Sequence, residues 1–582
     1  MTNAQLQREA GFSANIITRL KHNGYISLES VESICRVLNC GVDDILEFIP
    51  NEKENGNNEE KRMVDTKKEQ ERDELHRAIW AIADELRGAV DGWDFKNYVL
   101  GTMFYRYISE NLCNYINSGE IDAGNADFDF AKMPDEDAEE AREGLVEEKG
   151  FFILPSELFC NVRANAANDE NLNETLERVF RHIEESAKGS EAESDFDGLF
   201  DDYDVNSNKL GSTVAKRNEK LVKLLNGVGE MNLGDVKDHS IDAFGDAYEY
   251  LMTMYASNAG KSGGEFFTPA DVSELLTRLG TVGKTEINKV YDPACGSGSL
   301  LLKAEKILGK DAIRNGFYGQ EINITTYNLC RINMFLHDVE FDKFNIACED
   351  TLLSPQHWDD EPFELIVSNP PYSIKWAGDE NPLLINDPRF APAGVLAPKS
   401  KADMAFIMHS LSWLASNGTA AIVCFPGIMY RGGAEQKIRK YLVDNNYVDC
   451  IIQLPSNLFF GTSIATCIMV MKKNKTDNKT LFIDATSECV KVTNNNKLTP
   501  ENIDRIVDIF AKREEEEYFS HLASYEEVSG NDYNLSVSTY VEAEDTREKI
   551  DIVKLNAEIK EIVAREQVLR DEIDKIIAEI EG

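Results

Sequence analysis

The spacing of hydrophobic and polar positions changes along the chain and divides it into segments. From residue 73 to about residue 250, apolar residues recur at helical spacing, as in LHRAIWAIADELRGAV and WDFKNYVLGTMFYRYISENL. After residue 260 the pattern changes to short apolar runs that alternate with helical segments: KVYDPACG, FYGQEI, NIACED, ELIVSNPP, AAIVCFP, CIIQLP and CIMVMKK. Strands that alternate with helices in this order form a mostly parallel sheet. The pattern therefore predicts an all-helical domain followed by a doubly wound α/β domain.

The beginning of the chain carries a separate helical pattern. Residues 1–48 contain short amphipathic segments interrupted at Gly11, Gly24 and Gly41, with Ser13 and Ser27 placed as N-caps. Residues 51–71 are polar and charged without periodic apolar positions, which is typical of a linker that leads into a helix. A small helical domain joined by a linker is therefore expected before the large helical domain.

The end of the chain has a narrow apolar stripe. Its members stand at heptad positions: Ile552, Leu555, Ile559, Ile562, Leu569, Ile573, Ile576 and Ile580. So long a stripe favours a coiled coil with a partner over a helix packed on its own domain. The expected divisions are a small domain at 1–50, a linker at 51–72, the helical domain at 73–250, the α/β domain at 251–540 and a C-terminal partner helix at 541–582.

The charge limits what the surface can bind by itself. The net charge is −42 at pH 7, whereas contacts to nucleic-acid phosphates need Lys and Arg. We therefore do not expect this chain to be a general binder of polyanions. If DNA is its substrate, another chain is expected to hold the DNA.

Cysteine spacing and hydropathy exclude other classes of protein. The eleven cysteines form no CxxC pair and no Cys/His cluster at metal spacing, and no secretory signal opens the chain. The longest apolar runs, such as residues 419–430, are shorter than the roughly 18–20 residues of a membrane span. We expect a cytoplasmic protein with no structural metal and no membrane contact.

The first chemistry-bearing motif is the run DPACGSGSLL at residues 292–301. A strand ends there in a tight turn whose Gly296 and Gly298 tolerate positive φ and let the backbone approach a ligand closely. A nicotinamide dinucleotide is the rival ligand, but the GxGxxG fingerprint fails because Ser299-Leu300-Leu301 follows Gly298. The candidate nucleotide contacts in this loop are Asp292, Gly296, Ser297, Gly298 and Ser299.

Acidic residues also end the next two predicted strands. Glu321 ends FYGQEI, where a carboxylate can accept hydrogen bonds from ribose hydroxyls, and Asp350 ends NIACED, where it can accept from an adenine amino group. Each residue alone is more often structural. Their order at successive strand ends favours a nucleoside-containing cofactor.

The motif Asn369-Pro370-Pro371-Tyr372 closes the fourth predicted strand. The two prolines lack backbone donors, so the turn presents carbonyl acceptors. The side-chain oxygen of Asn369 and the carbonyl of Pro370 can accept from an exocyclic amine and aim its lone pair at a methyl donor, while Tyr372 offers a flat face for stacking an extruded base. No general base is demanded, because the lone pair attacks and the proton leaves afterwards.

Together these segments resemble the amino-methyltransferases that include N6-adenine enzymes, and more closely the modification subunit of type I restriction-modification systems. The closer resemblance covers about residues 63–582. It rests on WDFKNYVLGTMFYRYIS, SGGEFFTPADVSELL, RGGAEQKIRKYLVDNN, QLPSNLFFGTSIATCIMVMKK and NDYNLSVSTYV. Residues 1–48 separately resemble Cro/CI-type helix-turn-helix domains, with Ala14 to His22 at the recognition helix. This domain is an addition to the basic pattern, and operator binding and protein contact are both open as its role.

The resemblance implies a Rossmann-like methyltransferase domain that uses S-adenosyl-L-methionine and no metal. It assigns cofactor binding to the EFFTPA segment, that is Glu265, Phe266, Phe267, Thr268, Pro269 and Ala270, with Thr268 at the methionyl end. Without it, Phe266 and Phe267 would be interpreted as core. The family often has Phe where this chain has Tyr372, a difference that preserves stacking and adds a hydroxyl.

The resemblance also implies partners. In such systems a separate specificity subunit reads the double-stranded DNA, two modification subunits assemble on it, and a restriction subunit cleaves. Residues 373–400 form one loop that could close over a flipped base but is too short to read a DNA site. The recognition sequence, the preference for hemimethylated sites and the stoichiometry cannot be predicted.

Two other hypotheses stay open from the residues. The first is methylation of a protein glutamine or an RNA guanine, because the NPPY turn also suits those planar nitrogens. The second is a helix-turn-helix regulator whose methyltransferase fold has become an inactive scaffold. The intact Asn369, Gly296, Gly298 and Glu321 argue against the scaffold.

Overall fold

The computed structural model describes residues 35–37, 57–86, 92–233, 243–258, 268–459, 462–492, 495–543 and 552–581. Apart from the helical residues Cys35–Val37, the expected helix-turn-helix domain lies outside this range, as do Glu265, Phe266 and Phe267. The chain divides into two compact units, residues 1–71 and residues 72–582. The second unit contains all the elements discussed below, apart from the beginning of the first helix.

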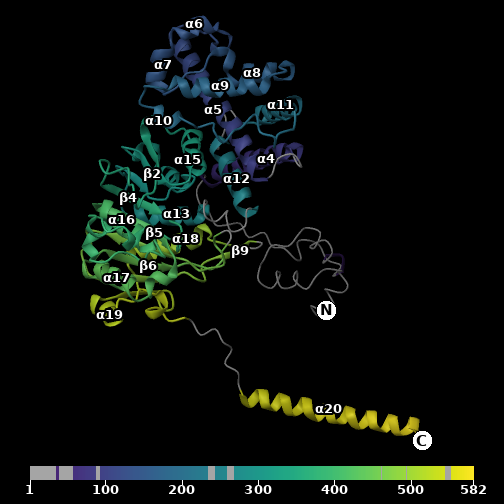
Figure 1. The fold of residues 1–582 in the computed structure, drawn as a ribbon. Coiled ribbons are helices and arrows are strands. Elements are labelled where there is room, and N and C mark those ends of the chain that lie inside the picture. The colour runs from purple at the N-terminus through teal and green to yellow at the C-terminus, as the bar shows by residue number, and fades with distance from the viewer. Residues whose placement is uncertain are drawn as a thin grey trace. The chain divides into compact units, whose positions relative to one another are not determined.

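Helices alone fill the described sequence up to residue 258, as the periodicity predicted (Figure 1). They are α4 (Asn57–Leu86), α5 (Gly92–Asp122), α6 (Asp135–Glu139), α7 (Arg142–Lys149), α8 (Phe159–Asn165), α9 (Leu172–Ser186), α10 (Glu193–Phe196), α11 (Val214–Glu230) and α12 (Ala243–Asn258). Helix α9 illustrates the rule, because Leu172, Leu176, Val179 and Ile183 recur at helical spacing and all are buried.

The α/β part is built on a nine-stranded sheet in the order β11-β8-β6-β7-β5-β4-β1-β2-β3. The strands are β1 (Val290–Asp292), β2 (Phe317–Glu321), β3 (Phe344–Cys348), β4 (Phe363–Ser368), β5 (Leu414–Cys424), β6 (Val448–Gln453), β7 (Cys467–Lys472), β8 (Thr480–Asp484) and β11 (Ser520–Ala523). Strand β7 runs antiparallel to β5 and β6, and β11 runs antiparallel to β8, whereas the other pairs are parallel. Every run predicted as a strand is a strand.

Helices cover both faces of this sheet. They are α13 (Ala270–Thr281), α14 (Ser299–Leu308), α15 (Ile324–Leu336), α16 (Asp403–Trp413), α17 (Ala434–Asp444), α18 (Pro500–Lys512) and α19 (Tyr525–Gly530). Strand β4 shows why two layers are needed: Leu365 and Val367 belong to one core, and Ile366 belongs to the other. Alternate side chains of a strand point to opposite faces, so both faces must be covered when both are apolar.

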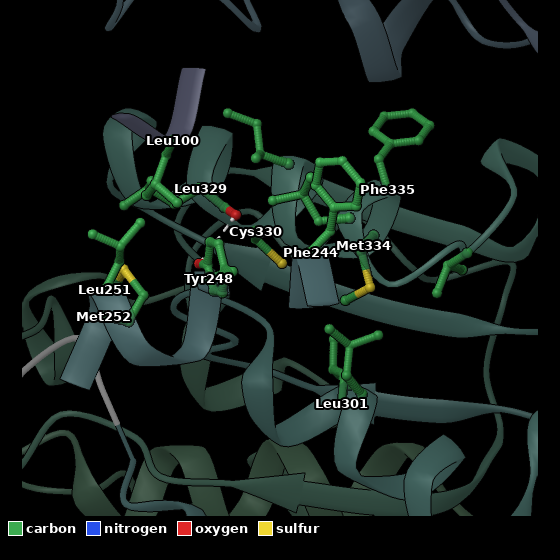
Figure 2. Close-up of a cluster of buried hydrophobic side chains, with 14 of the residues drawn as sticks. Leu100, Phe244, Tyr248, Leu251, Met252, Leu301, Leu329, Cys330, Met334 and Phe335 are labelled. Carbon is green, nitrogen blue, oxygen red and sulfur yellow. Dashed lines mark hydrogen bonds between the residues drawn. The ribbon is translucent and has the colours of Figure 1, made fainter. Parts of the chain in front are cut away.

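The helical domain shares a core with one of these layers. Figure 2 shows Leu100 of α5, Tyr248 of α12, Leu301 of α14 and Leu329 of α15 in the same cluster of buried side chains. The Tyr248 hydroxyl donates to the backbone carbonyl of Leu329 at 3.3 Å. The helical domain therefore packs directly behind the segments that carry the glycine-rich loop.

Two further elements complete the described secondary structure. A small two-stranded sheet pairs β9 (Val490–Val492) with β10 (Asn495–Lys497). Helix α20 (Ile552–Glu581) forms where the heptad pattern predicted a helix, and its described apolar side chains are exposed. Within the described ranges, no helix is long and apolar enough to cross a membrane.

Candidate active site

The sheet brings the separate sequence motifs to one edge. Strands β4, β1, β2 and β3 are neighbours and run parallel, so their carboxyl ends lie side by side. The NPPY turn follows β4, the glycine-rich loop follows β1, and Glu321 ends β2. Strand β3 ends at Cys348, so Asp350 lies in the turn beyond the strand. In open α/β sheets, ligands bind in the crevice at this edge.

Asp292 holds the glycine-rich loop in place through two hydrogen bonds. It is 1% exposed, and its Oδ1 accepts from the Ala294 amide at 2.9 Å and from the Ser368 hydroxyl at 2.7 Å. Burial raises the pKa of the Asp292 carboxyl to about 7. Because Ser368 is the last residue of β4, this bond ties the glycine-rich loop to the residue before Asn369. Ser368 carried no recognisable pattern in the sequence.

The two glycines are required by the geometry of the loop. Gly296 has φ of +54° and Gly298 has φ of +79°, a region that other residues rarely adopt. A Cβ at Gly298 would lie 2.7 Å from the Cys330 Sγ of α15. Helix α14 begins at Ser299, directly after this turn, so its free backbone N–H groups stand beside the loop.

Glu321 and Asp350 are held by backbone amides. The Glu321 Oε2 accepts from the Gly296 amide at 3.1 Å and its Oε1 accepts from the Asn323 amide at 2.9 Å. Burial raises the pKa of the Glu321 carboxyl. The Asp350 Oδ1 accepts from the amides of Leu352 and Leu353 at 2.9 and 3.2 Å. Each Glu321 oxygen keeps a second lone pair, and the other oxygen of the Asp350 carboxylate, Oδ2, offers lone pairs with which it can accept from a ligand.

Side chains of two helices support the loop from behind. The Asn333 Nδ2 of α15 donates to the Ser297 carbonyl at 2.8 Å, and the Tyr248 hydroxyl of α12 shares its one proton between this carbonyl, at 3.4 Å, and the Leu329 carbonyl. Both supporting residues are fully buried. Neither residue was predicted from the sequence, although an asparagine within the apolar run RINMFL was a usable signal.

The NPPY turn makes its own hydrogen-bond chain. The Asn369 Nδ2 donates to the Thr268 hydroxyl at 3.1 Å, and the Tyr372 hydroxyl donates to the Asn369 Oδ1 at 2.5 Å. Thr268 is therefore placed at the turn, and Pro269 beside it is the N-cap of α13. Ala270, the first residue of α13, is exposed. The Tyr372 ring is partly buried against the core that contains Leu365 and Val367, and burial raises the pKa of its phenol.

The residue after the turn is fixed by a carboxylate that was not predicted from the sequence. Ser373 has φ of +53°, and its amide donates to the Asp403 Oδ2 at 3.0 Å. Asp403 is the first residue of α16, where an acidic side chain is favourable. Among the described residues, no group of three or more His, Cys, Asp or Glu could hold a metal ion.

Comparisons with known proteins agree with this arrangement. The profile of the N-6 DNA methylase family matches residues 239–549, the HsdM N-terminal domain matches residues 75–228, and a Cro/C1-type helix-turn-helix DNA-binding domain matches residues 1–51. The chain is 50% identical over 535 residues to the type I restriction enzyme MpnII methylase subunit of Mycoplasma pneumoniae, a match covering 89% of this chain and 98% of that protein. It is 34% identical over 376 residues to the MjaVII methylase subunit of Methanocaldococcus jannaschii, covering 62% of each.

A solved structure extends the agreement to the fold. The type I restriction-modification system methyltransferase subunit from Streptococcus thermophilus matches with a TM-score of 0.73 and 36% identity. The match covers 81% of this chain and 100% of that one.

The sheet order, the glycine-rich loop and the NPPY turn on one edge define a Rossmann-like methyltransferase of the S-adenosylmethionine-dependent class. More specifically, the chain belongs to the N-6 DNA methylase family, among the methylase subunits of type I restriction enzymes. The expected fold class and family are both confirmed, and so is a Cro/C1-type domain at the N-terminus.

Proposed function

We propose that this chain transfers a methyl group from S-adenosyl-L-methionine to the N6 atom of adenine in double-stranded DNA. The observation that carries the proposal is the placement of Asn369 beside the glycine-rich loop, through the Ser368–Asp292 hydrogen bond. The cofactor supplies an electrophilic methyl group when it is bound. The residues of this chain have to bind it, orient it and present the amine.

The residues at the sheet edge fit such a cofactor. The turn of Asp292, Gly296, Ser297, Gly298 and Ser299 leads into the N-terminus of α14 and offers backbone donors beside glycines that admit a ligand. Glu321 at the end of β2 and Asp350 in the turn after β3 offer acidic acceptors, which suits the hydroxyls and the amino group of an adenosine. Thr268 accepts from Asn369 and keeps its own proton for the methionyl carboxylate. We propose that Glu265, Phe266, Phe267, Pro269 and Ala270 complete the site.

The NPPY turn would hold the target amine. We propose that the Asn369 Oδ1 and the Pro370 carbonyl accept from N6 of a flipped adenine, while Pro371 fixes the turn and Tyr372 stacks on the base. The bond from the Tyr372 hydroxyl leaves the second lone pair of the Asn369 Oδ1 for the substrate. No metal is required for this transfer.

We propose that the chain acts in the cytoplasm within a complex. A specificity subunit would grip and read the DNA, a second copy of this chain would methylate the other strand, and a restriction subunit would cleave. The net charge of −42 favours a separate DNA-holding chain. Helix α20, with its exposed heptad stripe, is the proposed contact to such a partner.

Asn369→Ala tests the role of the turn. The substitution should lower methyl transfer by a factor on the order of a hundred or more, because it removes a preorganised acceptor for the attacking amine. Binding of S-adenosyl-L-homocysteine should change little. Asn417→Ala is a matched control, because Asn417 donates to Glu364 at the opposite end of the same strands. It should leave methyl transfer unchanged.

The assay uses the full chain with its specificity partner, tritiated cofactor and DNA, and separately release factor and ribosomal RNA. Label in adenine N6 that disappears with Asn369→Ala supports the proposal. Label found only in protein glutamine or RNA guanine, or undiminished activity of Asn369→Ala, would refute it.

A further inference from the structure

The segment that follows the NPPY turn is folded back on itself. The Trp376 amide donates to the Lys399 carbonyl at 3.0 Å, and the Ala402 amide donates to the Ile374 carbonyl at 2.9 Å. The Trp376 indole N–H donates to the Pro398 carbonyl at 3.1 Å. Residues 374–402, here called the base-side loop, therefore leave and rejoin the site at the same place. A loop closed in this way moves as a unit unless its interior is attached elsewhere.

Arg389 attaches the middle of the base-side loop to residues outside the loop. It is 1% exposed, and hydrogen bonds engage all five of its N–H donors. Two of them, from Nε and Nη2, go to the Asp387 carboxylate of the same loop at 3.0 and 2.8 Å. Two others go from Nη1 and Nη2 to the backbone carbonyls of Thr351 and Leu352, both at 2.8 Å. The fifth goes from Nη1 to the Nδ1 of His409 at 3.2 Å.

The two carbonyls belong to the cofactor side of the site. Thr351 and Leu352 directly follow Asp350, the proposed acceptor for the cofactor's adenine, and the Leu352 amide donates to Asp350. The Thr351 hydroxyl donates to the Pro293 carbonyl of the glycine-rich loop at 2.6 Å. Arg389 is therefore bonded to a segment that is itself bonded to both nucleotide loops.

His409 continues the network towards β1. An arginine can only donate, so the His409 Nδ1 must accept, and the imidazole must be neutral with its proton on Nε2. That proton is donated to the Tyr291 hydroxyl at 2.8 Å. Burial, and then the nearby Arg389 charge, hold the pKa of His409 well below its usual value, in agreement with the neutral form. Tyr291 immediately precedes Asp292, so this path also ends at the glycine-rich loop.

We propose that Arg389 is a positioning residue that fastens the base-side loop to the cofactor-side turn, so that ordering the cofactor site also orders the loop that closes over the target base. This inference rests on the proposed function, since it takes Asp350 as a cofactor contact. It adds a physical link between the two halves of the site. Coupling of this kind needs one element that both sites bias.

Arginine suits this position and lysine does not. The planar fork reaches one carboxylate, two carbonyls and one imidazole at once, whereas an ammonium has three donors on a single nitrogen. In Arg389→Lys the charge and most of the buried volume persist, but the connections to Thr351, Leu352 and Asp387 cannot all be made. The substitution therefore detaches the loop without removing the buried cation.

Amide hydrogen exchange of the full chain, with and without S-adenosyl-L-homocysteine, tests the coupling. In the wild type, the ligand should slow exchange in peptides covering residues 350–355 and also in peptides covering residues 384–394, by a factor on the order of ten. In Arg389→Lys, the ligand should still slow the first set and should leave the second set unchanged. The Kd for the ligand should rise roughly tenfold.

Arg331→Lys controls for a general loss of stability. Arg331 is also 1% exposed and also donates to two backbone carbonyls, those of Ser194 and Asp197, but these lie in the helical domain. This variant should keep the exchange response of both sets. If Arg389→Lys does not fold, Asp387→Asn removes the acceptor for Nη2 while it leaves the arginine in place, and it should weaken the response of residues 384–394.

The outcomes separate the inference from the function on which it rests. If the ligand protects residues 350–355 and residues 384–394 to the same extent in the wild type and in Arg389→Lys, the positioning role is wrong. Protection of residues 350–355 alone in the wild type also overturns the coupling while it leaves the cofactor site standing. If the wild type shows no protection near residues 292–299, 321 or 350, the proposed cofactor site itself is wrong.

Discussion

Asp292 lies beneath the glycine-rich loop with hydrogen bonds from Ser368 and Ala294, and its pKa is about 7. The pKa of an unfolded aspartate is about 4, so the folded state binds this proton more tightly than the unfolded state. The stability that the proton contributes is full below about pH 4 and is lost as the pH rises through about 7. At neutral pH, the pH is therefore close to the pKa of the carboxyl group that supports the loop.

Asp292→Asn should remove this pH dependence, because the amide oxygen can still accept from Ser368 and Ala294. Between pH 5 and pH 8, the free energy of unfolding of the wild type should fall by about 2–3 kcal/mol more than that of the variant. Urea unfolding followed by tryptophan fluorescence at a series of pH values measures the difference. Parallel pH profiles for the two proteins would contradict the assignment.

Individual site residues could be predicted from the sequence when they stand at the end of an apolar run. Asn369, Asp292 and Glu321 do so, and the order of strands fixes their common edge. Arg389 and His409 could not be predicted, because their partners come from segments far away in sequence. The roles of the predicted residues stay predictions until substitution tests them.

Helix α14 shows how one element depends on the residues that flank it. Gly298 precedes it and Gly309 follows it, and both have positive φ. A Cβ at Gly298 would lie 2.7 Å from Cys330 Sγ and 3.0 Å from Met334 Cε, whereas a Cβ at Gly309 would meet nothing within 4 Å. An alanine at either position would therefore be strained by the positive φ. Only at position 298 would its Cβ also clash with neighbouring side chains.

Gly298→Ala and Gly309→Ala should separate these two effects. Each should lower stability by about 1–2 kcal/mol for the positive φ. Only Gly298→Ala should also raise the Kd for S-adenosyl-L-homocysteine by roughly tenfold or more, because the added methyl group clashes with Cys330 and Met334 of α15 and displaces the loop. Adding Cys330→Ala should restore part of that affinity, as measured by isothermal titration calorimetry. An equal loss of affinity in both alanine variants would show that crowding is not the cause.

The elements themselves followed closely from the apolar pattern. The strands β1 to β7 and the helix α20 formed where the sequence predicted them. The strands β8 and β11 at the far edge, and the small pair β9 and β10, were not predicted. Short runs such as LFID and SHLA are too brief to show a period, and they become strands because a neighbouring strand offers backbone partners.

The whole molecule combines an acidic catalytic chain with an exposed apolar helix. The net charge of −42 opposes a tight grip on DNA by this chain alone. Along α20 the side chains of Ile562, Leu569 and Ile573 are more than half exposed. An apolar stripe of this length is typical of a helix that packs against another helix.

The proposed contact through α20 predicts that Ile562→Lys combined with Ile573→Lys abolishes association with the proposed specificity subunit and, with it, methylation of specific DNA. Binding of S-adenosyl-L-homocysteine should remain unchanged, because the cofactor-side residues are not altered. Glu561→Lys combined with Glu572→Lys places lysines on the same helix outside the stripe and should preserve association. Analytical ultracentrifugation of the mixed subunits measures the outcome. Association that survives both pairs would exclude the stripe as the contact.

The order of strands along the sheet has a consequence for how such genes can be rearranged. Strands β1, β2 and β3 form one side of the β1–β4 pairing, strands β4 to β8 and β11 form the other, and residues 349–362 join the two blocks. Thr268, near the start of the first block, is hydrogen-bonded to Asn369 of the NPPY turn in the second block. A chain that encoded the second block before the first could preserve every strand pairing and the same crevice. The crevice therefore follows from the strand pairings and not from the order in which the two blocks are encoded.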